Sequence, residues 1–142
     1  MTTKIKIKKL NSSAKLPEKK SQGAAAWDLY SSEFRVIPKK KVGLVSTGLA
    51  MEIPFGWKGE IYSRSGLASK GIWVANQPGK IDSDYRGEIK VILYNNTHND
   101  FFVNAGDRIA QFEVNEVNNI TWEKTENLSV TKRSNKGFGS TG

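Results

Sequence analysis

Residues 79–88 read Gly79-Lys80-Ile81-Asp82-Ser83-Asp84-Tyr85-Arg86-Gly87-Glu88 and separate two apolar runs. A glycine near each end permits backbone geometry that suits a tight hairpin or the close approach of a ligand. Asp82 follows the apolar Ile81, so its carboxylate can lie at the edge of a core and act as a base. The plainer interpretation is a polar β-turn to which Asp and Gly contribute the geometry. Local chemistry alone leaves both interpretations open.

Short apolar runs on either side of this stretch predict strands. They alternate or cluster over 4–8 residues, and Gly, Pro and Asn separate them. No long segment has the 3.6-residue period of a helix, although a short helix can begin near Leu67. We expect a single all-β domain, a distorted jelly-roll barrel or sandwich, with at most one short helix. The expected strands cover residues 3–10, 24–30, 34–37, 42–53, 60–62, 72–75, 89–95, 101–103 and 108–114.

Composition narrows the function classes. The 142 residues suit one domain, and no apolar run approaches the roughly 20 residues that span a bilayer. The absence of cysteine excludes disulfides and thiolate metal sites, and the single His98 argues against a histidine-rich zinc site. The N-terminus lacks a charged-then-apolar signal, so we expect an intracellular protein without a membrane partner. The net charge of +8 favours anionic partners such as nucleotide phosphates, with solubility as the alternative.

Five short motifs occur in order along the chain. They are Ala-Ala-Trp-Asp-Leu-Tyr at 25–30, Arg-Ser-Gly-Leu-Ala at 64–68, the stretch 79–88, Gly-Asp-Arg-Ile-Ala-Gln at 106–111, and residues 133–142, which end Gly-Phe-Gly-Ser-Thr-Gly. Each is weak alone, but the five together span nearly the whole chain from residue 24 onward. In this order they resemble the motifs of the trimeric dUTP diphosphatases (dUTPases).

The resemblance implies an enzyme that hydrolyses dUTP to dUMP and pyrophosphate by Mg²⁺-assisted attack of water on the α-phosphorus. Such an enzyme limits uracil incorporation into DNA and supplies dUMP for thymidylate synthesis. It also implies a homotrimer in which three subunits share each active site. By the same resemblance, residues 1–128 form the β-barrel domain, and residues 129–142 form a mobile arm that closes an active site. Direct nucleic-acid binding is not expected.

The resemblance assigns the reaction to three side chains. Asp82 matches the residue that orients and activates the water, and Gln111 matches a residue beside the α-phosphate. Asp28 matches the carboxylate near the metal, which can act through coordinated water. Without the resemblance, Asp82 would be a turn cap, Gln111 a surface glutamine and Asp28 an exposed strand residue.

Substrate binding is assigned to three groups by the same resemblance. Arg64, Ser65 and Gly66 match a phosphate cradle, in which a guanidinium, a hydroxyl and backbone N–H groups meet phosphate oxygens. Tyr85 matches the ring beneath the deoxyribose, and Asn76 matches a uracil-reading asparagine. Each has a plainer alternative as a loop, core or turn residue. The remaining positions are Gly79 in the base-recognising hairpin, and Arg133, Phe138, Gly139, Ser140 and Thr141 in the arm, for which a free disordered tail is the alternative.

The chain departs from the family pattern in several places. Ala26 and Trp27 replace Gly-Tyr, Ser63 replaces a proline, and Lys80 stands where an aliphatic residue is common. Ser134 and Lys136 replace glycines of the arm, which should stiffen it. The alternative functions are a non-catalytic nucleotide-binding regulatory relative, a dCTP deaminase-like enzyme and a basic nucleic-acid-binding β-barrel. For the last, aromatics should interleave with basic groups on a strand face.

Overall fold

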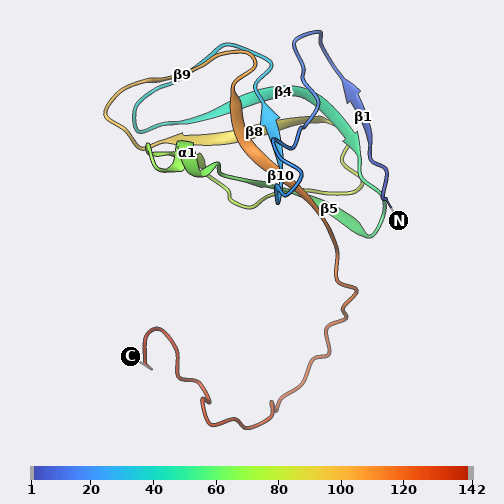
Figure 1. The fold of residues 1–142 in the computed structure, drawn as a ribbon. Coiled ribbons are helices and arrows are strands. Elements are labelled where there is room, and N and C mark those ends of the chain that lie inside the picture. Colours follow the sequence, from blue (N-terminus) through green and yellow to red (C-terminus); the bar gives the residue numbers. More distant parts are fainter. Residues whose placement is uncertain (1, 141–142) are drawn as a thin grey trace.

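The computed structural model describes residues 2–140, and within them it contains ten strands and one short helix (Figure 1). The first sheet has the order β1 (Lys6–Lys9), β4 (Val42–Glu52), β8 (Glu88–Asn95) and β6 (Ile72–Val74). The second has the order β2 (Trp27–Tyr30), β10 (Arg108–Glu116), β5 (Trp57–Tyr62) and β7 (Gly79–Ile81). A small third sheet pairs β3 (Arg35–Ile37) with β9 (Phe101–Val103), and helix α1 covers Ser65–Ala68.

One apolar core lies between the two large sheets. Strand β8 contributes Ile89, Val91 and Leu93, each at most 1% exposed, and the second sheet contributes Ile61 and Phe112. Alternate residues of these strands therefore face inward, as in a sandwich. The all-β prediction is confirmed. The described strands pair as separate sheets rather than as a closed barrel.

Strand β4 passes through residues 42–52 as one strand with a bulge. Its pairing with β8 shifts register between Ser46 and Ala50, and Gly48 in this segment has a φ of +67°. A Cβ added to Gly48 would lie 2.8 Å from the Cβ of Ala14, so both the backbone and the space favour glycine. The bulge allows β4 to pair with β8 over one part and with β1 over another.

The stretch 79–88 is not a hairpin, which corrects one of the expectations from sequence. Its first residues form β7 in the second sheet, and Glu88 begins β8 in the first. The two strands are joined by a turn in which Tyr85 N–H donates to the Asp82 carbonyl at 3.2 Å. The stretch therefore carries the chain from one sheet to the other. Glycine and aspartate suit either kind of connection, so local sequence does not distinguish them.

The chain leaves the sheets after Glu116. Residues 117–140 contain no strand or helix and extend away from the body in Figure 1. The part of the chain outside the sheets thus includes residues 117–128 in addition to residues 129–140 of the predicted arm. Among the described residues, no helix is both long and apolar enough to cross a membrane.

Candidate active site

Asp28 lies on the edge strand β2 and is only 7% exposed. Strand alternation directs Leu29 into the core and leaves Asp28 and Tyr30 on the opposite face. A loop pairs with the outer edge of β2 at this position: the backbones of Glu18 and Asp28 exchange two hydrogen bonds, of 3.3 and 2.7 Å. Asp28 is thus not the exposed strand residue of the plainer interpretation.

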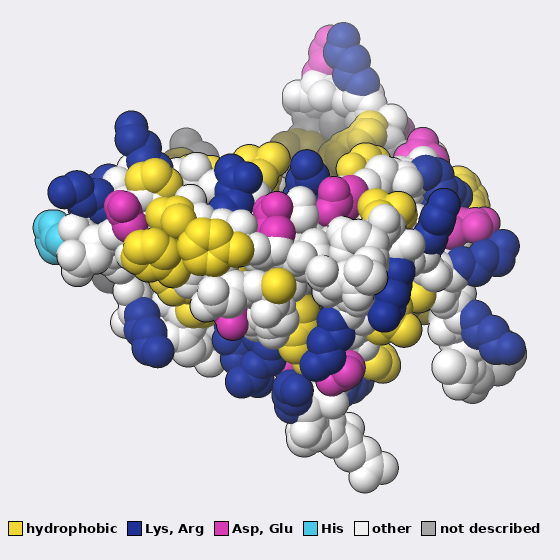
Figure 2. All heavy atoms as spheres, turned by 90° about the horizontal axis from the view of Figure 1, so that it is seen from above, with side chains coloured by type: hydrophobic (Ala, Val, Ile, Leu, Met, Phe, Trp, Pro, Cys, Tyr) yellow, Lys and Arg dark blue, Asp and Glu magenta, His cyan; other side chains and the backbone are white. Residues whose placement is uncertain are grey.

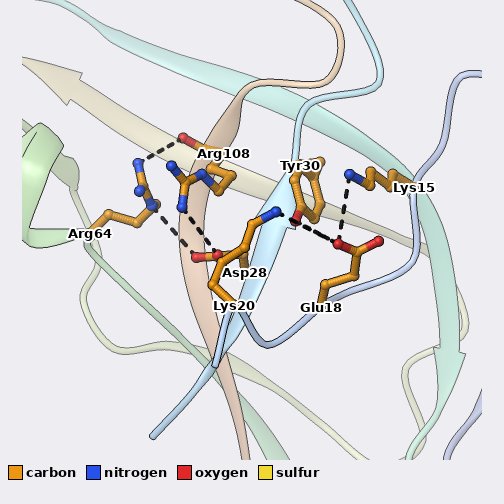
Figure 3. Close-up of polar contacts among 7 residues, drawn as sticks. All are labelled: Lys15, Glu18, Lys20, Asp28, Tyr30, Arg64 and Arg108. Atoms are coloured by element: carbon orange, nitrogen blue, oxygen red, sulfur yellow. Dashed lines mark hydrogen bonds and ion pairs between the residues drawn. The ribbon is translucent and has the colours of Figure 1, made fainter. Parts of the chain in front are cut away.

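Two arginines approach the Asp28 carboxylate from neighbouring elements (Figure 3). Arg64 Nε lies 3.6 Å from Asp28 Oδ1, and an Nη atom of Arg108 lies 3.7 Å from Oδ2. Arg64 also donates an Nη–H to the Arg108 carbonyl at 3.4 Å. The Arg64 Nε atom is buried, yet among the described residues it has no hydrogen-bond partner. Its ion-pair partner, Asp28 Oδ1 at 3.6 Å, is beyond hydrogen-bond distance, so this buried donor carries the cost of an unmade hydrogen bond.

The loop before Arg64 is fixed by Ser63, one of the departures from the family pattern. Val74 N–H donates to Ser63 Oγ at 2.8 Å, and Ser63 N–H donates to Gln77 Oε1 at 2.6 Å. A proline at 63 could make neither bond. Ser65 and Gly66 follow at the start of α1 and are exposed, with nothing within 4 Å of a Cβ added to Gly66. The loop therefore presents an accessible hydroxyl and backbone beside Arg64.

Gln111 is the direct cross-strand partner of both Asp28 and Tyr62. Directly opposed side chains share a face of a sheet, so Gln111 lies between the other two on the polar face. The structure therefore brings together Asp28, Arg64 and Gln111, and it adds Arg108. From sequence alone, Arg108 had no place among the candidate site residues. Its pairing with Asp28 depends on an irregularity between Arg108 and Ala110 in the β2–β10 register, which has no local sequence signal.

A second group of predicted residues lines a separate cleft of about 590 Å³. Tyr85 donates its hydroxyl to the Glu88 carbonyl at 2.9 Å, which fixes the ring beside Asp82. Gly87 lies under that ring: an added Cβ would be 2.5 Å from Tyr85 Oη. The cleft lining comprises Leu44, Asn76, Lys80, Ile81, Asp82, Tyr85, Glu88, Lys90 and Ile92. Gly79 adjoins it, since a Cβ there would lie 3.3 Å from Asn76 Nδ2.

The two groups lie at opposite edges of the second sheet. Asp28 is on β2, Asp82 follows β7, and β10 and β5 lie between them. At a strand spacing of about 4.8 Å, the two edges are about 14 Å apart. Among residues 2–140, no hydrogen bond or ion pair joins Asp82 or Tyr85 to the Asp28 group. Within one chain, the two groups of predicted site residues therefore lie apart.

As far as residue 140, the arm forms no hydrogen bond or ion pair with either group. Arg133 Nε–H donates to the Lys136 carbonyl at 2.9 Å, and Ser140 N–H donates to the Gly137 carbonyl at 3.1 Å. Both bonds are internal to the arm, and Phe138 is fully exposed. Gly139 has a φ of +84°, which favours glycine. Thr141 lies outside the described residues.

A buried carboxylate between the two groups was not singled out from sequence. Glu60, 5% exposed on β5, accepts the Tyr62 hydroxyl at 2.6 Å and pairs with Lys58 at 2.9 Å. The Tyr62 and Lys58 contacts lower the pKa of Glu60, and the bond to Glu60 raises the pKa of Tyr62 to about 12. Because Tyr62 opposes Gln111 and Lys80 opposes Glu60, this cluster lies between the Asp28 group and the β7 edge.

Residues 12–142 match the family model described as dUTPase. The chain belongs to the dUTPase family. The deoxyuridine 5'-triphosphate nucleotidohydrolase of Nautilia profundicola is 49% identical to this dUTPase, and the match covers 98% of this chain and 99% of the relative. The deoxyuridine 5'-triphosphate nucleotidohydrolase of Helicobacter hepaticus is 48% identical, and the match covers 97% of this chain and 88% of the relative. The Staphylococcus bacteriophage 80alpha dUTPase, solved as a G164S mutant with dUpNHpp, superposes with a TM-score of 0.90 at 26% identity and covers 99% of both chains.

This dUTPase is therefore a dUTP diphosphatase, an enzyme that hydrolyses dUTP to dUMP and pyrophosphate. The predicted family, activity and all-β fold are confirmed. Both relatives compared above are nucleotidohydrolases for dUTP, which decides against the dCTP deaminase-like alternative.

Proposed function

We propose that this dUTPase builds each active site from the Asp82 cleft of one copy, the Asp28 group of a second copy and the arm of a third, in a homotrimer. The observation that carries the proposal is the separation of the two groups, about 14 Å across the sheet, within one chain. A base and the phosphate that its water attacks must lie within hydrogen-bond reach of one water molecule. A second copy, related by symmetry, satisfies this requirement.

Exposed apolar side chains support assembly. Figure 2 shows such side chains gathered on one face of the body near the only histidine. On β4, Val42 and Leu44 are 52% and 46% exposed, and on the segment after β10, Trp122 and Val130 are 91% and 97% exposed. Large apolar side chains that remain exposed in a single copy are typical of surfaces that contact another subunit.

The phosphates of dUTP bind the Asp28 group in this proposal. Arg64 donates guanidinium N–H groups, Ser65 its hydroxyl and the Gly66 region its backbone N–H to phosphate oxygens. Gln111 donates an amide N–H near the α-phosphate. The two arginines beside Asp28 give the group a net positive charge, which suits a polyphosphate.

Mg²⁺ fits this group as a partner of the substrate. The described residues contain no cluster of three or more His, Cys, Asp or Glu, so they offer no cage made by protein alone. Mg²⁺ commonly binds one or two carboxylates together with substrate phosphates and several waters, and Asp28 provides one carboxylate. When bound, the ion neutralises charge that develops on the phosphates. Asp28 would hold it, directly or through water, while Arg64 and Arg108 bind phosphate oxygens.

The nucleoside binds the Asp82 cleft. Tyr85, fixed through its hydroxyl, forms the floor beneath the deoxyribose and leaves no room for a 2′-hydroxyl. Asn76 and the backbone beside Gly79 read the uracil. The Asp82 carboxylate takes a proton from the attacking water and directs that water at the α-phosphorus. The arm then covers the site, with Phe138 over the base and Arg133, Ser140 and Thr141 at the terminal phosphates.

The Asp82→Asn variant tests this assignment. We expect kcat to fall roughly 10³-fold because the amide cannot accept the proton, while the Kd for dUTP changes only a few-fold. Asp84→Asn is the matched control: it removes the other carboxylate of the same turn, does not line the cleft, and should keep wild-type turnover. Equal kcat in the Asp82→Asn variant and the wild type would falsify the assigned role.

A further inference from the structure

We propose that Lys20 and Lys15 bind the terminal phosphates of the substrate, as an extension of the Asp28 group; this inference rests on the phosphate-binding role proposed for that group. Both lysines belong to the loop that pairs with the edge of β2 at Glu18 and Asp28. Figure 3 shows them with Glu18 and Tyr30 on one side of Asp28, and Arg64 and Arg108 on the other. Together these side chains form a row of charges that contains four cations and two carboxylates: Lys15, Lys20, Arg64, Arg108, Glu18 and Asp28.

The loop positions both lysines on the same face as Asp28. Its backbone pairs with β2 through Glu18 and Asp28. Lys15 Nζ lies 4.2 Å and Lys20 Nζ 5.7 Å from the centroid of the Tyr30 ring, and Tyr30 shares its face of β2 with Asp28. Arg108 is the cross-strand partner of Tyr30, so the lysines and the arginine lie around one buried ring.

Both lysines remain available to a ligand. They share a single carboxylate, Glu18, at 3.7 and 3.8 Å, and that carboxylate also accepts the Tyr30 hydroxyl at 3.2 Å. The side chains of Lys15 and Lys20 are 45% and 51% exposed. Ion pairs this long and this exposed are weak. A phosphate with several oxygens and more negative charge can therefore draw either ammonium away from Glu18.

The row of charges suits a chain of phosphates rather than a single one. Arg64 and Arg108 bracket Asp28, and Lys20 and Lys15 continue the positive charge along the loop. A phosphate chain that begins at Gln111 and passes Asp28 meets the lysines at its far end. The lysines should thus contribute to binding of dUTP and of the pyrophosphate product, and not to binding of dUMP.

The neighbouring Lys19 provides a matched control. Its Nζ lies 5.2 Å from the centroid of the Trp27 ring, and Trp27 lies on the opposite face of β2 from Asp28. Lys19→Gln therefore removes the same charge one residue away without affecting the row. Lys20→Arg keeps the charge in the row and should behave as wild type.

Steady-state kinetics on the full-length enzyme with Mg²⁺ test the inference. We expect Lys20→Gln to raise the KM for dUTP about five-fold and Lys15→Gln/Lys20→Gln about ten-fold, with kcat within about two-fold of wild type. Inhibition by pyrophosphate should weaken in parallel, and inhibition by dUMP should not change. The increase in KM should shrink at high salt.

Two results would overturn the inference: an unchanged KM in the double variant, or equal changes in Lys19→Gln and Lys20→Gln. An equal loss of dUMP inhibition would overturn it as well. If Lys20→Gln lowers the melting temperature, the KM for dUTP of the single variant Lys15→Gln decides the question instead. Variants of Arg64 distinguish an error in the lysine assignment from an error in the proposed phosphate site. If only the lysine assignment is wrong, the Arg64 variants still lose activity.

Discussion

Asp28 and Gln111 are direct partners in the antiparallel register of β2 and β10. This pairing brings residues from motifs about eighty positions apart in the sequence onto one face of a sheet. Rigid strands, rather than loops, carry both side chains, and strands hold their relative positions well. Arg64 joins them from the loop after β5, the strand that pairs with the other side of β10. The half of the site for which we propose phosphate binding is thus organised around β10.

Arg64→Lys tests whether the guanidinium fork is required. Lysine keeps the charge but cannot place an Nε–H and an Nη–H in the same arrangement. We expect kcat/KM to fall about 10- to 100-fold, the equivalent of one charge-assisted hydrogen bond. Arg35→Lys, on the exposed end of β3, is the control and should leave kcat/KM unchanged. A wild-type value for Arg64→Lys would show that charge alone suffices.

Gly87→Ala tests the position of Tyr85. The new Cβ would lie 2.5 Å from Tyr85 Oη and 2.7 Å from Cζ, so the ring must move while the sheets remain. We expect the KM for dUTP to rise roughly ten-fold, because misfit of about one methylene group in a pocket has an effect of this size. The preference of the enzyme for dUTP over UTP should decrease as well. Gly23→Ala, where an added Cβ meets nothing within 4 Å, should have no effect. Unchanged discrimination in Gly87→Ala would exclude Tyr85 as the residue that senses the sugar.

The Glu60 cluster predicts how stability depends on pH. The pKa of Glu60 is lower in the folded chain, so its stabilisation is present above the usual carboxyl pKa and is lost as pH falls through the folded value. The pKa of Tyr62 is raised from 10.0 to about 12, so its contribution is present below pH 10 and is lost as pH rises toward 12. The free energy of unfolding, measured with urea at fixed protein concentration, should therefore decline in two pH windows. One is the acidic window in which Glu60 is protonated, and the other is the alkaline window between pH 10 and about 12.

One hydrogen bond links the two windows, so each variant should change both. Tyr62→Phe should abolish the part of the alkaline decline that is due to Tyr62 and reduce the acidic decline. Glu60→Gln should abolish the acidic decline that is due to Glu60 and reduce the alkaline one. Identical pH profiles in wild type and both variants would mean that the cluster is not formed in solution.

Much of the fold was predictable because local sequence patterns indicate most of its strands. The alternation of lysine and isoleucine from residue 3 to 10 indicated the strand β1, observed at Lys6–Lys9. The apolar run after Gly87 indicated β8. The sheet in which each strand pairs was not predictable, since a turn such as 82–85 joins strands of one sheet or of two with the same residues. Of the geometries that the local sequence left open for residues 79–88, the polar turn is formed and the hairpin is not.

The candidate site was predictable residue by residue, but not as an arrangement. Motif residues such as Asp28 and Gln111 were identified through the resemblance, and their pairing follows from register. Arg108 required a shift in the β2–β10 register to reach Asp28, and such shifts depend on tertiary packing. Lys15 and Lys20 lie in a segment that reads as a plain polar loop. Only the long-range contact of that loop with β2 relates them to the site.

The most direct test of the shared site uses mixed trimers of two inactive chains, Asp82→Asn and Arg64→Gln, co-expressed with different tags and purified through both. If each site combines the cleft of one copy with the Asp28 group of a neighbour, every mixed trimer contains one site with both halves intact. We expect roughly one third of the wild-type turnover per trimer, where each parent alone is nearly inactive. Mixed trimers as inactive as their parents would show that each chain builds its site alone and would contradict this account.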